Sequence, residues 1–169
     1  MYLISSFVVD PALSPVASIN ISNPAGFRHI TAFWKGASSA AVTNQGLQAQ
    51  FNGDTGANYY WEPLDAINTA IGAVASAGDT SMRAGIIPGS SATAGMVGGG
   101  RIDIPFAGDI YYKMLLALSG GPTTLTAAGQ SLETSMAFWA AADPVTSMLL
   151  FPAAGGFVTG FGIDVYGLV

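Results

Sequence analysis

Cysteine is absent from this chain of 169 residues, and histidine occurs once, as His29. Without thiols the chain can build no disulfide framework, no cysteine-ligated zinc or iron–sulfur site and no thiol nucleophile. A Ser-His-Asp arrangement would have to use His29, which stands in an expected strand with no glycine-flanked nucleophile near it. We therefore predict a protein that is not an enzyme and that carries no catalytic residues and no cofactor.

Acidic side chains are also few, ten in all. Asp54, Glu62 and Asp65 could supply a pair of carboxylates for glycoside hydrolysis, but ordinary turn chemistry explains acids in such a stretch equally well. Asn52, Asp54 and Asn58 could offer oxygen ligands to calcium, yet their spacing lacks the EF-hand pattern and its bidentate glutamate. We expect hydrogen-bonded turns in this segment and no metal site.

Charge of either sign is scarce, because only five basic residues accompany the ten acids and the net charge is −5. Surface scaling gives a folded monomer of this mass roughly 7,800 Å² of accessible surface, or about 500 Å² per charge against about 190 Å² at ordinary composition. Much of the surface must therefore be neutral or apolar, which favours a protomer covered by partner subunits. The basic residues form no stripe that could neutralise phosphates, so we expect no nucleic-acid partner.

No segment has the pattern of a membrane span or a signal peptide. The apolar N-terminal stretch carries Asp10 and has no basic region before it, which argues against a cleaved signal. Two uncharged windows, 114–132 and 144–163, contain proline, paired glycines and two-residue alternation. We expect strands there and no membrane partner.

The dominant periodicity of the chain is two residues, as in LQAQFN (47–52) and RIDIPF (101–106). Turn-forming clusters separate the alternating segments, and only 65–74 has a spacing that would suit a short helix. The pattern predicts an all-β chain, an antiparallel β-sandwich of jelly-roll topology with about eight to ten strands. Since no repeat or shift in composition divides the chain, we predict one domain over residues 1–169, with residues 1–15 as an N-terminal arm or edge strand.

The same alternation predicts which side chains form the core between the two sheets. The residues expected to be buried are Phe51, Ile102, Ile104, Met114, Leu116, Met136, Phe138 and Ile163. Truncation of Phe138 to alanine would then cost about 3 to 5 kcal/mol of stability.

Several segments resemble one known family. In order along the chain they are FRHITAFW (27–34), FNGDTGANYYW (51–61), GIIPGSSATA (85–94), RIDIPF (101–106), AFWAAADPVTSMLL (137–150) and GGFVTGFGIDVYGLV (155–169). In order and spacing they resemble the jelly-roll proteins of phage virions and tail fibres, across most of the chain. Phe161 and Val165 depart from the family pattern, and both make the last strand more apolar.

The resemblance implies a structural role in a bacteriophage virion, at the capsid surface or in an appendage, and carries over no catalytic residues. The first hypothesis is a capsid decoration (cement) protein that oligomerises on the particle and stabilises it. Its implied partners are its own copies, with a homotrimer favoured, and the major capsid protein or another virion protein. The alternative is a tail-fibre or head-fibre module that recognises a host-surface glycan.

Aromatic side chains are the candidates for these interfaces. Those of FNGDTGANYYW could alternate between core and surface, could dock a neighbouring protein, or could stack against a sugar ring. We predict interface positions at Phe27, Phe33, Trp34, Tyr59, Tyr60, Trp61, Phe161 and Tyr166.

Overall fold

The computed structural model of the chain describes residues 1–23, 26–126 and 129–169. Within these residues the chain forms thirteen β-strands and one 3-10 turn, η1 (Pro11–Leu13). The strands are β1 (Tyr2–Val8), β2 (Ile19–Ser22), β3 (His29–Gly36), β4 (Asn44–Phe51), β5 (Tyr59–Ile67), β6 (Ala70–Ala73), β7 (Ser76–Asp79), β8 (Met82–Pro88), β9 (Gly98–Ile104), β10 (Lys113–Pro122), β11 (Gln130–Trp139), β12 (Ser147–Pro152) and β13 (Gly162–Leu168).

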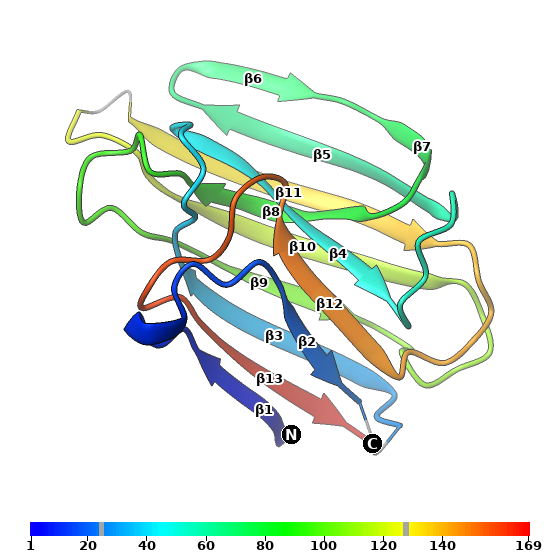
Figure 1. Cartoon of the computed structure of the whole chain (residues 1–169). Helices are drawn as coiled ribbons and strands as arrows, with labels where there is room; N and C mark the ends of the chain where they lie inside the picture. The colour runs from blue at the N-terminus through cyan, green and yellow to red at the C-terminus, as the bar shows by residue number, and fades with distance from the viewer. Residues whose placement is uncertain (24–25, 127–128) are drawn as a thin grey trace.

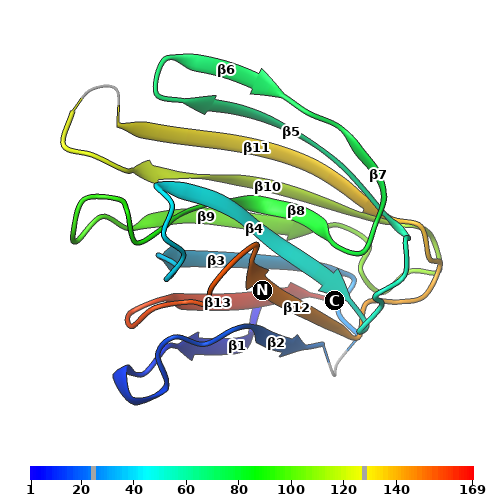
Figure 2. The same cartoon turned by 45° about the horizontal axis from the view of Figure 1, so that its top comes forward.

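Eight of the strands form an antiparallel sandwich of two four-stranded layers. One layer has the order β1-β13-β3-β9 and the other the order β2-β12-β4-β8. Along the chain, these strands alternate between the two layers in the order that defines a jelly roll, so the predicted fold class is confirmed. Figures 1 and 2 show the smaller sheet lying across the larger one, with β1 and β13 side by side.

The remaining five strands extend one layer only. The larger sheet continues past β9 through β10, β11, β5 and β6, with β7 pairing to β5, so it holds nine strands against four in the smaller sheet. These additions are the reason that the strand number exceeds the eight to ten expected. They also widen the larger sheet beyond the layer that covers it (Figure 1).

The segment 65–74 is a strand hairpin and not the short helix that its spacing suggested. β5 pairs with β6 from Leu64↔Ala73 to Ile67↔Ala70. The two-residue turn between them places Asn68 at a φ of 57°, a conformation that asparagine tolerates better than most residues. Because the turn brings the two strands together, each gains a ladder of hydrogen bonds that an isolated two-turn helix would not have.

Half of the predicted core is confirmed. Phe51, Ile102, Ile104 and Ile163 are buried between the sheets. In contrast, Leu116 is 40% exposed, Met136 56% and Phe138 41%, and the fourth, Met114, is half-buried. The prediction for these four residues is wrong because β10 and β11 turn their more apolar side outward.

A buried ion pair explains the orientation of β11. Arg83 on β8 donates two hydrogen bonds to Glu133 on β11, Nη2 to Oε2 at 2.6 Å and Nε to Oε1 at 2.9 Å. The hydroxyl of Ser135, two residues further on the same side, donates to the carbonyl oxygen of Arg83 at 3.0 Å. Glu133 and Ser135 therefore face inward with Ala137 and Trp139, which are also buried, and the alternate residues of the strand must face outward.

The FNGDTGANYYW segment connects the two sheets and does not form a hairpin, since β4 lies in the smaller sheet and β5 in the larger. Asn52 and Gly53 have positive φ values of 53° and 67°, which turn the chain. Phe51 and Tyr59 are both buried, and the Tyr59 hydroxyl accepts a hydrogen bond from the Phe51 amide at 2.9 Å. The turn therefore joins two strand ends that are anchored in one core.

No helix in the described parts of the chain has the length and hydrophobicity needed to cross a membrane.

Candidate functional site

Three of the eight aromatic interface candidates lie in the core, and their assignment is corrected. Trp34, Tyr59 and Phe161 are 4% exposed or less. The Phe161 ring stacks on Trp34 at a centroid distance of 6.2 Å and on Phe157 at 3.9 Å. The apolar residue at position 161 thus completes the interior between the sheets, and it is not covered by a neighbouring molecule.

The other five candidates are at least partly accessible, but they lie on two separate regions. Phe33 and Tyr166 meet edge to face at 6.2 Å on the outer side of β3 and β13, and Phe27 stacks on Tyr2 nearby. Tyr60 and Trp61 lie on β5, far along the larger sheet, but on opposite sides of it, and Trp61 packs against the core. The structure therefore does not bring the predicted aromatic residues into one surface.

The outer surface of the larger sheet is divided into a charged half and an apolar half. On β3 and β9, the Asp103 carboxylate accepts hydrogen bonds from Arg101 Nη2 at 2.9 Å and from Thr31 Oγ1 at 2.7 Å. Burial opposes ionisation of Asp103, but these hydrogen bonds outweigh it and hold its pKa below the usual value. His29 Nε2 lies 3.6 Å from the same carboxylate.

The apolar half covers the strands that extend the sheet. We call it the outer apolar face, and it consists of Tyr60 and Leu64 on β5, Ile71 on β6, Met114, Leu116 and Leu118 on β10, and Leu132, Met136 and Phe138 on β11. The strand registers place these side chains in adjacent rows, with Phe138 beside Met114 and Tyr60, and Met136 beside Leu116 and Glu62. In the described part of this half, Glu62 is the one charged side chain that points outward.

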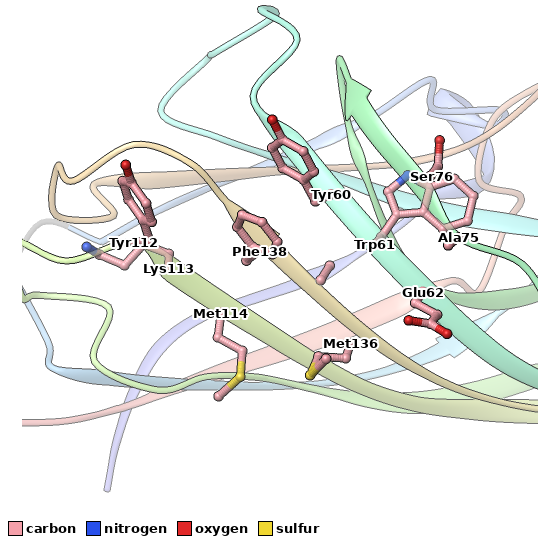
Figure 3. Close-up of a pocket in the computed structure, with 11 residues that line it drawn as sticks. Tyr60, Trp61, Glu62, Ala75, Ser76, Tyr112, Lys113, Met114, Met136 and Phe138 are labelled. Carbon is pink, nitrogen blue, oxygen red and sulfur yellow. The ribbon is translucent and has the colours of Figure 1, made fainter.

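A groove of about 370 Å³ indents one end of the outer apolar face. Figure 3 shows the rings of Tyr60 and Phe138 next to each other, with Met114 and Met136 farther along the groove. The two rings are parallel, with an interplanar angle of 2° and a centroid distance of 4.6 Å. Such a groove can bind a flat or apolar group by stacking and dispersion.

The lysine that lines this groove has its ammonium group turned to the backbone. Lys113 is 1% exposed, and its Nζ donates to the carbonyl oxygens of Asp109 and Tyr111. Burial lowers the pKa of Lys113, while the negative charges of Asp109 and Asp143 oppose that effect. Since its donors are directed at backbone oxygens, Lys113 helps to fix the loop before β10 and offers little to a ligand.

The polar turn at 52–58 uses its oxygens within the chain. Asp54 accepts hydrogen bonds from Trp139 Nε1 at 2.6 Å, from the Asn58 side chain at 2.9 Å and from the Gly56 amide at 2.7 Å. These three bonds hold the pKa of Asp54 below its usual value, with the bond from Trp139 contributing most. Within the described residues, no cluster of three or more histidine or acidic side chains could hold a metal ion.

A second exposed apolar group lies in the loop between β9 and β10, residues 105–112, which we call the end loop. Phe106, Ile110, Tyr111 and Tyr112 are exposed there. Phe106 has a φ of 56°, which is rare for a bulky residue, and the Asp109 amide donates to its carbonyl oxygen at 3.1 Å. The loop thus presents large side chains to solvent from a closed turn.

Neither apolar surface was identified from the sequence. The alternation of β10 and β11 was visible, but it placed their apolar side in the core. The charges on the other side of the same strands, Lys113 and Glu133, favoured the wrong choice, because charged side chains usually face solvent. An inward charge is favourable only with a partner, and the partner of Glu133 is Arg83, fifty residues away.

Comparison with known proteins found no match among protein-family models or curated protein sequences. Two solved structures share very low similarity with the chain. The CBM40 of Ruminococcus gnavus IT-sialidase, bound to alpha2,3 sialyllactose, has 7% identity and a TM-score of 0.32 over 97% of this chain and 92% of that one. The Clostridium perfringens CspB protease has 8% identity and a TM-score of 0.14 over 86% of this chain and 26% of that one. At these TM-scores neither structure bears on function.

Proposed function

We propose that this chain is a non-enzymatic structural protein of a bacteriophage virion, of the capsid decoration (cement) type, which oligomerises on the particle and stabilises it. The observation that carries the proposal is the outer apolar face, because a sheet that turns Leu116, Met136 and Phe138 toward solvent needs a partner to cover them. The resemblance of the chain to virion jelly-roll proteins supplies the setting.

Charge supports the same proposal. The chain has 7892 Å² of accessible surface and only five basic and ten acidic side chains. Two of the ion pairs, Arg83–Glu133 and Arg101–Asp103, neutralise charge within the chain. A surface with so few charged groups loses little hydration when it is covered, which suits a subunit of a larger assembly.

Two separate apolar surfaces suit two kinds of contact. The outer apolar face is broad and nearly continuous, which suits contact between copies of the chain. The end loop is compact and carries Phe106, Ile110 and Tyr111, which suits insertion into a neighbouring shell protein. In this arrangement the decoration protein holds shell subunits together through buried apolar area. The family resemblance favours a trimer of the chain, and several linked copies would bind the shell more tightly than one copy.

Labelling of virus particles tests the proposal directly. Antibodies against the purified chain, coupled to gold, should label the surface of particles of the virus that encodes it. Emptied particles should bind the added chain, and Ile110→Asp and Tyr111→Ala in the end loop should weaken that binding. Particles that carry no label and do not bind the chain contradict the virion role.

The groove favours a second candidate function, the recognition of a host-surface glycan. Parallel Tyr60 and Phe138 rings form a stacking platform, and the Glu62 carboxylate beside them could accept hydrogen bonds from sugar hydroxyls. Screening the chain against immobilised glycans, with Tyr60→Ala as the control that removes the platform, tests this candidate. Binding that disappears in the variant would favour a receptor-binding module over decoration.

A further inference from the structure

We infer that the outer apolar face is the contact surface for a second copy of this chain, related to the first by a twofold axis that runs nearly parallel to β10 and β11. The inference rests on the same surface as the proposed function and specifies its partner. Two larger sheets would then pack face to face at about 10 Å, as the layers of aligned β-sandwiches do.

The area of the face agrees with that of a stable pair. Seven large side chains contribute most of it, each with 40% to 81% of its surface exposed: Leu64, Ile71, Leu116, Leu118, Leu132, Met136 and Phe138. At roughly 150–200 Å² for a fully exposed side chain of this size, they expose roughly 550–750 Å² per copy. A standard specific interface buries about 800 Å² on each partner, and monomers rarely leave a patch this large uncovered.

The strand order shows how two copies would align. Across the face the order is β5, β11, β10 and β9. The twofold axis would run parallel to the strands and lie above the outer apolar face, midway between β10 and β11. Rotation by 180° about it exchanges the strands on its two sides. β10 of one copy then lies over β11 of the second, so the leucine and methionine rows meet, and β5 lies over β9 of the second copy.

This alignment also brings Glu62 of one copy to the Arg101–Asp103 ion pair of the other. Glu62 on β5 and Asp103 on β9 stand in one row, since both flank the pair Met136↔Leu116. The Arg101 guanidinium reaches into that row through Nε, 2.7 Å from Asp103 Oδ2. Glu62 of one copy then lies over Asp103 of the second, and the Arg101 guanidinium that bonds to Asp103 is the cation placed to neutralise both carboxylates. By symmetry the contact forms twice.

A twofold pair fits this surface better than the threefold ring that the family resemblance favours. A twofold contact joins one patch to the same patch on the other copy, whereas a ring needs two different complementary patches on every copy. The outer apolar face is one continuous patch with Glu62 on one flank and Arg101 on the other. It is therefore self-complementary under the twofold rotation.

The first test is the mass of the full chain by sedimentation equilibrium at micromolar concentration. We expect two copies, and a rise in the dissociation constant of at least about 100-fold for Met136→Glu, which places an unpaired charge at the centre of the contact. Ile110→Glu is the matched control, since Ile110 is also an exposed apolar residue but lies in the end loop, and it should leave the pair intact. A mass of one copy or of three copies, or no effect of Met136→Glu, overturns the inference.

Charge reversal tests the orientation. Arg101→Glu should weaken the pair about tenfold, because three carboxylates then meet. The double variant with Glu62→Arg should regain most of the affinity, because opposite charges meet again. Circular dichroism of each variant confirms that the fold is kept. If the double variant does not regain affinity, the proposed orientation of the twofold axis is wrong. Gold labelling of particles does not depend on the mass measured by sedimentation. If the chain sediments as a single copy but particles are labelled, the twofold pair is wrong and the virion role stands.

Discussion

Arg83 and Glu133 join the two sheets of the jelly roll through an ion pair that solvent barely reaches. The side chain of Glu133 is fully buried, and that of Arg83 is 18% exposed. Two parallel N–H···O contacts give the pair the bidentate geometry in which arginine binds carboxylates most strongly. The pair ties β8 of the smaller sheet to β11 of the larger and determines which side of β11 faces solvent.

Removal of one partner of this pair should destabilise the fold strongly. We expect Glu133→Ala to lower the free energy of unfolding by about 3–5 kcal/mol, because the Arg83 charge would stay buried without a counter-charge. Urea unfolding of the purified variant measures the effect. Arg28→Ala is the matched control, since the Arg28 side chain is 64% exposed and its pair with Asp109 should contribute less than about 1 kcal/mol. Equal losses in the two variants would contradict the structural role of the buried pair.

The sequence predicted the antiparallel sandwich because alternation and turn residues act locally. In β4 and β9 one side of the strand is clearly more apolar than the other, and Phe51, Ile102 and Ile104 were assigned correctly. β10 has apolar residues on both sides, so alternation could not decide between Leu115, which is buried, and Leu116, which is not. That choice depends on a contact between sheets, and a pairing such as Arg83 with Glu133 leaves no local trace.

The candidate surface was missed for the same reason. Three consecutive aromatic residues at the start of β5 must alternate between the two sides of the sheet, but their sequence does not show which side is interior. Tyr59 faces the core because its hydroxyl bonds to the backbone of Phe51 and Asp54, and Tyr60 then faces outward. The outer location of Tyr60 could be inferred only once that bond was known.

Acid should destabilise the turn at 52–58 through Asp54. The pKa of this carboxyl is below its ordinary value in the folded chain, so at low pH the unfolded chain binds the proton more readily. Its stabilising contribution is therefore complete above the ordinary pKa of 3.8 and is lost as pH falls through the lower folded value. Asp54→Asn should flatten the fall in unfolding free energy below about pH 4, measured by urea unfolding at a series of pH values.

Asn58→Ala refines the same measurement. It keeps the titrating carboxylate but removes one of its three hydrogen-bond donors, which brings the folded pKa closer to the unfolded one. The loss of stability in acid should therefore be smaller, and it should be complete at a higher pH than in the natural chain. An acid profile that is the same in the natural chain and in Asp54→Asn would show that other carboxyl groups control the acid response.

The buried hydroxyl of Tyr59 should contribute measurably to stability. It accepts from the Phe51 amide and donates to the carbonyl oxygen of Asp54 at 3.0 Å. We expect Tyr59→Phe to cost about 1–3 kcal/mol, because the Phe51 amide would be left without an acceptor. Burial also raises the pKa of Tyr59 to about 12, so its absorbance change in alkaline titration should come later than in an unfolded chain. Tyr60→Phe, on the outer surface, should leave the unfolding free energy nearly unchanged.

Two phenylalanines distinguish the core from the outer apolar face. Phe161 is fully buried between Trp34 and Phe157, so Phe161→Ala should cost about 3–5 kcal/mol in unfolding free energy at any protein concentration. Phe138→Ala should cost less than about 1.5 kcal/mol under conditions in which the chain is a single copy, because nearly half of the residue is already in water.

The concentration dependence of the second variant makes the distinction decisive. Partner binding to the folded state adds stability by mass action, so at high concentration the natural chain should gain stability that Phe138→Ala does not gain. Thermal unfolding at two concentrations a hundredfold apart measures this difference. A large, concentration-independent loss for Phe138→Ala would mean that this side chain packs inside the protomer, and the inward orientation expected from alternation alone would then be the correct one.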